Sequence, residues 1–469
     1  MYHSTRGNKN VTSYEAIING LADDGGLYVI DEIPKLSYKE VLNYSYQMLA
    51  GKIISLFFSE LAFEDIQREI DEAYKSFDIS EVVNITMLDG KAILELYHGP
   101  TGAFKDIALV VLPRMLKLAK EKINNKEITT ILTATSGDTG GATLSGFKDV
   151  SGIETIVLYP TNGVSPLQEA QMQSFNNGNG HVLAIRGNFD DCQSFVKKFF
   201  LNNRNLHLSS ANSINISRLV PQIVYYYYTY IKLIKDKVIK EDEKINFTVP
   251  TGNFGDILAG YIAKMMGLPI DKLICASNKN NVLTDFFKTN VYDANREFYK
   301  TNSPSMDIII SSNLERLLYY TTRSTAKVKE AMDDLKKYKR FTLEGDYSSF
   351  NAFYTDEEET NLTIKEYYNE YNYLVDPHTA VGLAALKKFK TMKINDNYNV
   401  VLSTASPLKF YDSVAKAISL DSRDLIDFCN KLNIELPNKF KYNSFNKNDI
   451  KLTDLDAKIK EIISCYTLK

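Results

Sequence analysis

The chain has 469 residues, enough for two or three domains with large buried cores. Its 55 Lys and Arg residues nearly balance 58 Asp and Glu residues, and the formal net charge of -3 argues against a general nucleic-acid-binding surface. The sequence has no apolar stretch long enough to span a membrane and no apolar leader, and its scattered cysteines and histidines lack metal-ligand spacing, so we expect a reduced, cytoplasmic protein without a metal site.

The first 90 residues differ in pattern from the rest of the chain. Amphipathic patterns at 14–18 and 63–77 predict a mainly helical N-terminal module. From Ala92 onward, strand and helix patterns alternate, with strands expected at 92–96, 128–134, 154–159, 181–186, 245–250 and the start of 400–407. This alternation predicts an α/β fold with largely parallel sheets and helices on both faces.

Residues 98–106 read His-Gly-Pro-Thr-Gly-Ala-Phe-Lys-Asp and place Lys105 between a tight turn and an apolar run. A lysine partly removed from water loses some preference for its charged form, so its amine becomes a nucleophile able to form a Schiff base with pyridoxal phosphate (PLP). A lysine in the first turn of a helix that reaches to solvent would give the same pattern. The neighbouring segments decide between the two interpretations.

The strand expected at 128–134 runs into Thr-Ser-Gly-Asp-Thr-Gly-Gly at 135–141, followed by a small-residue helix from about Ala142. The backbone N–H groups and hydroxyls of this loop suit an anionic group such as a carboxylate. A common βα turn with an Asp or Thr cap is the alternative.

Two later strands also end in loops suited to ligands. The strand at 245–250 leads into Thr-Gly-Asn-Phe-Gly-Asp at 251–256 and a helix, where two glycines and the helix start favour a phosphate. No Gly-Lys-Ser/Thr follows, which argues against nucleoside triphosphates. The strand near 400 delivers hydroxyls at its C-terminal end, where ligands bind in open α/β sheets, with a Ser/Thr-Pro turn as the alternative.

The remaining segments carry fewer signals. The tyrosine run 225–228 is expected to lie in a helix and to pack in the core. Residues 285–373 carry no motif and are expected to form an insertion, with helices near 314–320 and 325–337. Helices at 412–418 and 421–432 are expected to close the chain.

In their joint order these segments resemble threonine synthase, a family of the tryptophan-synthase-like class (fold type II) of PLP enzymes. The resemblance covers nearly the whole chain, and further matching blocks lie at 4–7, 20–29, 211–215 with Arg218 and Gln222, 376–382 and 403–410. It implies an N-terminal domain at 1–90, a catalytic region at 91–410 with two open, largely parallel α/β subdomains around a cofactor cleft and an insertion at about 285–373, and a helical C-terminal segment at 411–469.

The resemblance also implies a role for each matching residue. Lys105 would hold PLP as a Schiff base and then move protons. Other contacts to the cofactor would come from Asp138, Gly252, Asn253, Phe254, Gly255, Asp256 and Thr404. The substrate would be held by Ser136, Gly137, Asp138, Thr139, Asn212, Ser213 and Arg218. For Arg218, whose planar fork matches a phosphate dianion, a surface salt bridge is the alternative.

The implied reaction converts O-phospho-L-homoserine and water to L-threonine and phosphate, the last step of threonine biosynthesis. A related PLP phospholyase that only eliminates phosphate, or a catalytically silent PLP-fold protein, are the alternatives. Ser406 stands where many relatives carry histidine, and Asp138 where shorter relatives have asparagine. We expect a monomer, with a homodimer as the alternative, and neither a nucleic-acid nor a membrane partner.

Overall fold

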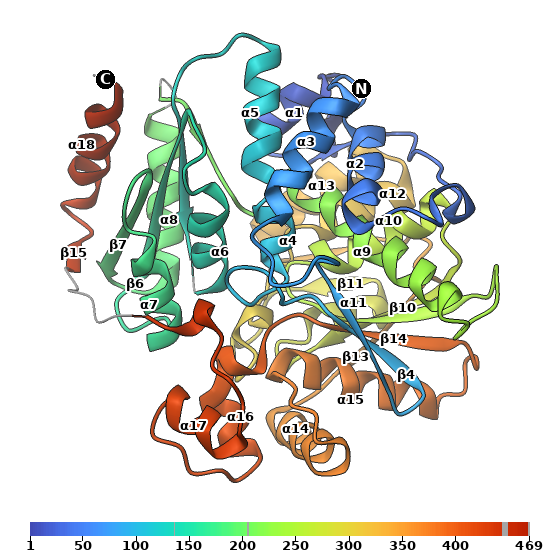
Figure 1. Cartoon of the computed structure of the whole chain (residues 1–469). Coiled ribbons are helices and arrows are strands. Elements are labelled where there is room, and N and C mark those ends of the chain that lie inside the picture. Colours follow the sequence, from blue (N-terminus) through green and yellow to red (C-terminus); the bar gives the residue numbers. More distant parts are fainter. Residues whose placement is uncertain (136, 204–205, 443–448, 468–469) are drawn as a thin grey trace.

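The fold is built around two open β-sheets (Figure 1). The computed structural model of the chain describes residues 1–135, 137–203, 206–442 and 449–467. The larger sheet has the strand order β13 (Phe350–Tyr354), β10 (Ile270–Ser277), β9 (Ile245–Pro250), β14 (Tyr398–Ser403), β4 (Lys91–Glu95) and β3 (Asn84–Leu88). The smaller sheet has the order β15 (Asp449–Lys451), β7 (Gly180–Arg186), β6 (Ile153–Pro160), β5 (Thr129–Ala134) and β8 (Leu208–Ser209).

All neighbouring strands of these two sheets are parallel except β3, which pairs antiparallel with β4 at one edge. Parallel strands need crossover connections, which helices supply here. The helices around the larger sheet are α9 (Ile216–Lys235), α10 (Gly255–Met266), α11 (Val282–Thr289), α14 (Glu357–Tyr371), α15 (Pro377–Thr391), α16 (Tyr411–Ala417) and α17 (Leu425–Leu432). The helices around the smaller sheet are α6 (Asp138–Phe147), α7 (Pro166–Ser174), α8 (Phe189–Asn202) and α18 (Leu455–Thr467). The α/β class expected from the sequence is confirmed.

Alternating side chains bury both faces of each sheet. On β14, Val400 and Leu402 enter the core shared with α9 and α10, whereas Val401 enters the one shared with α15. On β6, Ile156 packs with α8 and α18, and Val157 packs with α6 and α7. Both faces are covered, so the strands read as continuous apolar runs rather than alternating ones.

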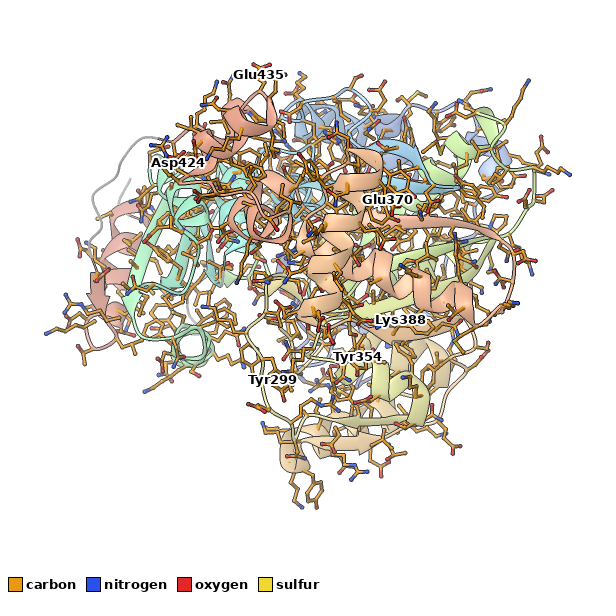
Figure 2. All side chains as sticks on the ribbon, turned by 90° about the horizontal axis from the view of Figure 1, so that it is seen from below. Tyr299, Tyr354, Glu370, Lys388, Asp424 and Glu435 are labelled. Atoms are coloured by element: carbon orange, nitrogen blue, oxygen red, sulfur yellow. The ribbon has the colours of Figure 1, made fainter. Side chains whose placement is uncertain are left out.

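Helix α15 is tied to the edge of the larger sheet. Figure 2 shows Lys388 of α15 beside Tyr354 at the end of β13. The Lys388 ammonium donates to the main-chain oxygen of Tyr354 (2.6 Å) and to the carboxylate of Glu359 on α14 (2.7 Å). These contacts tie α15 both to the end of β13 and to α14.

The N-terminal region is mainly helical, as expected. It contains β1 (His3–Ser4) paired with β2 (Tyr28–Val29), and α1 (Ser13–Asn19), α2 (Tyr46–Phe57) and α3 (Phe63–Tyr74). Helix α3 packs against α5 (Leu112–Lys122), which follows α4 (Lys105–Leu109). The motif-free stretch after α11 forms a small pair, β11 (Val291–Asp293) with β12 (Arg340–Thr342), and α12 (Leu314–Thr322) and α13 (Thr325–Tyr338). Within the described residues no helix is both long enough and apolar enough to cross a bilayer.

Two helices begin at positions that differ from the sequence expectation. Helix α6 begins at Asp138 rather than near Ala142, because Gly137 takes a φ of +143° and the Thr135 hydroxyl accepts the Gly137 and Gly140 N–H groups (3.0 Å each). Helix α17 begins at Leu425 rather than at 421, because the Asp424 side chain caps it. A side-chain cap therefore sets the start of α17, whereas hydrogen bonds within the preceding loop set the start of α6.

Helix α12 fastens the N-terminal segment to the catalytic region. The carboxylate of Glu315 accepts hydrogen bonds from Thr5 Oγ1 (2.5 Å), Arg6 Nε (2.8 Å) and Arg6 Nη2 (2.7 Å). The neighbouring Arg316, fully buried, donates to the main-chain oxygens of Tyr28 (3.0 Å) and Ile214 (2.5 Å). The first strands and the loop before α9 are therefore held by adjacent residues of one helix.

Replacing Glu315 by alanine is expected to lower the free energy of unfolding by about 2–4 kcal/mol, because charge-assisted hydrogen bonds at a largely buried carboxylate are lost. Urea unfolding measures this change. Glu330→Ala on the exposed side of α13 is the matched control and should change stability by less than about 0.5 kcal/mol. Equal stability of the two variants would contradict the fastening role.

Candidate active site

Lys105 begins α4 directly after the turn at 99–104. The turn is fixed by the fully buried Asp106, whose carboxylate accepts the Thr101 N–H (2.8 Å) and Thr101 Oγ1 (2.6 Å). A side chain on Gly99 would lie 2.5 Å from the Asp106 Cβ, so only glycine fits there. Asp106 therefore orients the backbone around the lysine.

The Lys105 amine lies in a shielded, polar environment. Its side chain is 15% exposed, its Nζ lies 3.8 Å from Asp138 Oδ2, and it donates to Ser305 Oγ (3.3 Å). Burial lowers the pKa of Lys105 to about 8; the attraction of Asp138 opposes the shift and the nearby cations Lys409 and Arg218 add to it. The neutral, nucleophilic form is therefore far more populated near neutral pH than for an exposed lysine.

Asp138 is the centre of a buried hydrogen-bond network. Its Oδ1 accepts from Lys409 Nζ (2.9 Å) and Gln168 Nε2 (2.9 Å), and its Oδ2 accepts from Ser305 Oγ (3.0 Å). Burial disfavours the ionised carboxyl, but the charges of Lys409 and Lys105 outweigh it and hold the pKa of Asp138 well below its usual range. Asp138 is thus a fixed anion rather than a proton carrier.

The loop before α6 offers backbone donors. Gly137 adopts the positive φ that favours glycine, and a side chain there would lie 2.5 Å from Gln168. Helix α6 has no side-chain cap, so the first-turn N–H groups at Asp138 and Thr139 can meet an anionic ligand. Ser136, expected in the same group, lies outside the described residues.

The start of α10 has the properties of a phosphate site. Phe254 adopts a left-handed conformation (φ +65°) and the helix has no side-chain cap, so the N–H groups from Gly255 onward lack a capping side chain. A side chain on Gly252 would lie 2.6 Å from the main-chain oxygen of Ser305. The loop of Gly252, Asn253, Phe254 and Gly255 therefore passes directly beside the residue that contacts Lys105.

Asp256, expected to bind the cofactor, is directed toward helix α9. Its Oδ1 accepts from Tyr225 OH (2.5 Å) and Tyr226 OH (2.9 Å), while no protein group bonds to its Oδ2 within the described part of the chain. Burial raises the pKa of Asp256 to about 7, against the lowering effect of the two hydroxyls. The tyrosine run lies in α9 and packs in the core, as expected.

Arg218 is a buried cation with unused hydrogen-bonding capacity. It is the third residue of α9, where the helix dipole disfavours positive charge, and it is only 4% exposed. Its Nη1 donates to the main-chain oxygen of Ala211 (2.7 Å), its Nε has no partner among the described residues, and burial lowers its pKa to about 10. A buried guanidinium in this position calls for an anionic ligand.

The segment before α9 is linked to the α10 loop. The Asn313 side chain donates to the main-chain oxygen of Ser213 (3.0 Å), and the Asn313 N–H donates to the main-chain oxygen of Asn253 (3.0 Å). Ser213 Oγ also lies 3.3 Å from Ser312 Oγ, and Asn212 lies next to it in the same loop. One residue of the motif-free region thus bridges two expected ligand loops.

The end of β14 adjoins the lysine turn. The main-chain oxygen of Thr404 accepts the Phe104 N–H (2.9 Å), and the Ser406 N–H donates to the Gly102 oxygen (2.9 Å). Thr404 is buried beside the residue preceding Lys105. Asp138, the loop at 252–255 and the end of β14 therefore adjoin Lys105 or its turn. Asp256, by contrast, is directed away from the lysine.

The sequence interpretation missed two residues of the site, Ser305 and Lys409. Ser305 lies in the motif-free region, and its N–H donates to His378 Nε2 (3.2 Å), whose Nδ1 lies 2.7 Å from the capping Asp376 carboxylate. Lys409 was part of a matching block, but nothing in its local pattern indicated a buried ammonium. The short 3₁₀ turn Pro407–Phe410 turns it inward.

The site thus combines a lysine of lowered pKa with two separate places for an anion, the start of α10 and Arg218. A phosphorylated aldehyde such as PLP fits this arrangement, since the lysine can bond to the aldehyde and the uncapped helix can hold the phosphate. The second anion site, at Arg218, would remain for a substrate.

Comparisons with known proteins agree with this chemistry. The family described as "Threonine synthase N terminus" matches residues 1–74, "Pyridoxal-phosphate dependent enzyme" matches 93–404 and "Threonine synthase, C-terminal" matches 379–462. The chain is 38% identical to a threonine synthase of Saccharomyces cerevisiae over 89% of each chain, and 37% identical to one of Pseudomonas aeruginosa over 89% of this chain and 90% of the other.

A solved structure of PLP-bound threonine synthase from Brucella melitensis superposes with a TM-score of 0.88 at 37% identity, covering 98% of this chain and 99% of the other. The yeast threonine synthase structure gives a TM-score of 0.89 at 35% identity, covering 99% and 98%. These similarities confirm the expected fold type II architecture.

Proposed function

The chain belongs to the threonine synthase family of PLP-dependent enzymes, and we propose that its substrate is O-phospho-L-homoserine, which it converts with water to L-threonine and phosphate. The observation that carries the substrate assignment is Arg218, a buried guanidinium without an acidic partner within the described part of the chain. A substrate phosphate supplies the missing negative charge and matches the planar fork. Thr139, Asn212 and Ser213 are proposed to complete this phosphate site.

We further propose that Lys105 is the reactive lysine. Its shielded amine has a pKa of about 8, set mainly by burial, so it can bond to the aldehyde and later accept and return protons at the substrate carbons. When bound, PLP supplies an electron sink for the negative charge that develops on those carbons. The backbone of Gly252 to Gly255 is proposed to hold the cofactor phosphate, and Thr404 to meet its ring nitrogen.

The other proposed residues orient and shield these groups. The Ser305 hydroxyl accepts a hydrogen bond from Lys105 and donates one to Asp138, so it can fix the direction of the Lys105 amine. Asp138 is a fixed anion close to the lysine, and the N–H groups of Asp138 and Thr139 at the start of α6 are proposed to bind the substrate carboxylate. Each of these residues fixes the position of a reacting group. Such positioning can supply a large part of the reduction in the activation barrier.

Product analysis tests the assignment. The purified protein, loaded with PLP and given O-phospho-L-homoserine, is expected to release phosphate and L-threonine in equal amounts, because water adds at the carbon next to the one that loses phosphate. Chromatography of the products against both standards measures this. Formation of 2-oxobutyrate in place of threonine would support the elimination-only alternative, and the absence of turnover would support a silent binding protein.

We also propose that the protein is a cytoplasmic monomer. Its four cysteines are free thiols, with Cys192, Cys275 and Cys429 buried, which fits a reducing compartment. Size-exclusion chromatography with light scattering distinguishes the monomer of 53.2 kDa from a homodimer.

A further inference from the structure

Lys409 has no part in the reaction proposed above, yet it lies in the same network. Its side chain is fully buried, and its Nζ contacts Asp138 Oδ1 (2.9 Å) and the main-chain oxygen of Thr101 (3.0 Å). A buried ammonium is costly unless it is paired and hydrogen-bonded, so its position needs a reason. Both of its contacts lead to groups that surround Lys105.

Asp138 presents its two carboxylate oxygens to two different lysines. Oδ1 pairs with Lys409 at 2.9 Å, and Oδ2 faces Lys105 at 3.8 Å. An unpaired carboxylate this close to Lys105 would attract a proton to its amine and keep it charged. With Lys409 present, the three groups together are electrically neutral when the Lys105 amine is neutral. Without it, they would be neutral only when Lys105 is protonated.

We propose that Lys409 is a positioning residue that acts through Asp138: it neutralises this carboxylate and so leaves the Lys105 amine free to lose its proton. The inference rests on the proposed role of Lys105 as the reactive lysine. Lys409 does not touch the reacting groups. It compensates the charge of Asp138, the carboxylate that faces Lys105, and fixes its orientation.

The other charged groups around Lys105 do not replace this effect. Arg218 on α9 also disfavours the protonated amine, whereas Asp106 on α4 favours it, as does Asp138 on α6. Asp106 is held by Thr101 on the far side of the turn, so its charge is partly satisfied there. Lys409 is the cation that bonds directly to the carboxylate facing the Lys105 amine.

Competitive acetylation of the full-length, cofactor-free protein tests the proposal without any turnover. Trace acetic anhydride labels neutral amines, and mass spectrometry of the peptide that contains Lys105 gives the midpoint of its titration. Lys409→Met should raise this midpoint by about one pH unit or more, because the Asp138 charge then acts on Lys105 alone. Lys409→Arg, which keeps the charge, should leave it near that of the unmodified sequence.

The matched control is Lys120→Met. Lys120, in the last turn of α5, is also buried, but its Nζ donates to the main-chain oxygens of Glu127 and Gly152 (3.0 Å for Gly152), so its removal should leave the Lys105 midpoint unchanged. An unchanged midpoint in Lys409→Met, with circular dichroism showing a native fold, would overturn the proposal.

A second comparison covers the case in which Lys409→Met does not fold. In Asp138→Asn, Lys409 remains as an unpaired cation, so the Lys105 midpoint should lie below that of the Asp138→Asn/Lys409→Met double variant. Equal midpoints would also overturn the proposal. Because acetylation reports only on the amine, this outcome is independent of whether O-phospho-L-homoserine is the substrate, which product analysis tests separately.

Discussion

Replacing Lys105 by alanine is expected to lower the rate of threonine formation by about 10³-fold or more, because the variant loses both the nucleophile and the proton carrier. Initial rates of phosphate release at saturating PLP and O-phospho-L-homoserine measure the loss. Lys105→Arg should be equally inactive, since a guanidinium keeps the positive charge but offers no neutral amine at accessible pH. Lys122→Ala, at an exposed position of α5, is the control and should retain full activity.

A second readout separates loss of chemistry from loss of folding. After treatment with borohydride, the unmodified protein should carry PLP covalently on the peptide that contains Lys105, and the alanine variant should carry none there. A variant that turned over substrate at the native rate, or a reduced cofactor found on another lysine, would show that the reactive amine had been assigned to the wrong residue.

The sequence predicted those parts of the site that local chemistry determines. The turn before Lys105, the glycines of the loop 252–255 and the strand–loop–helix order depend on neighbouring residues alone. An apolar run ended by glycines and hydroxyls has few structural solutions, and in a parallel sheet the C-terminal ends of the strands meet at one edge. The strand expected at 245–250 formed as β9 with the same bounds.

The charge network could not be predicted in this way, because its members come from distant parts of the chain. Ser305 reaches Lys105 from a stretch without any motif, 200 residues away in sequence. Lys409 is buried only because a short 3₁₀ turn directs it toward Asp138. Neither of these tertiary contacts is encoded in the periodicity of the sequence. The start of α6 depends on a local contact, the hydrogen bonds that the Thr135 hydroxyl accepts within its own loop, and periodicity does not show this contact either.

Replacing Arg218 by methionine is expected to raise the KM for O-phospho-L-homoserine by about 10²-fold, because two or more charge-assisted hydrogen bonds to the phosphate are lost. The visible absorption of bound PLP should hardly change, since the cofactor phosphate is proposed to lie at the start of α10. Steady-state kinetics and a PLP titration measure the two effects. Equal damage to both would contradict a role confined to the substrate phosphate.

The same substitution is also expected to raise the stability of the protein, which is unusual for the removal of a buried side chain's polar group. Arg218 is buried without an acidic partner among the described residues, so in the absence of a ligand it costs free energy, and Arg218→Met should stabilise the protein by about 1 kcal/mol or more. The buried Arg316 is the matched contrast: its Nε, Nη1 and Nη2 donate to Tyr28, Asn313 and Ile214, so Arg316→Met should destabilise the fold.

Thermal unfolding of the PLP-saturated protein with and without inorganic phosphate completes the argument. Phosphate should stabilise the unmodified protein, because it binds the folded state at Arg218, and should have little effect on Arg218→Met. A protein that is destabilised by Arg218→Met and still responds to phosphate would show that this guanidinium is structural. The opposite result would show that Arg218 is kept for a ligand: the guanidinium would lower the stability of the protein without phosphate and would be needed for phosphate to stabilise it.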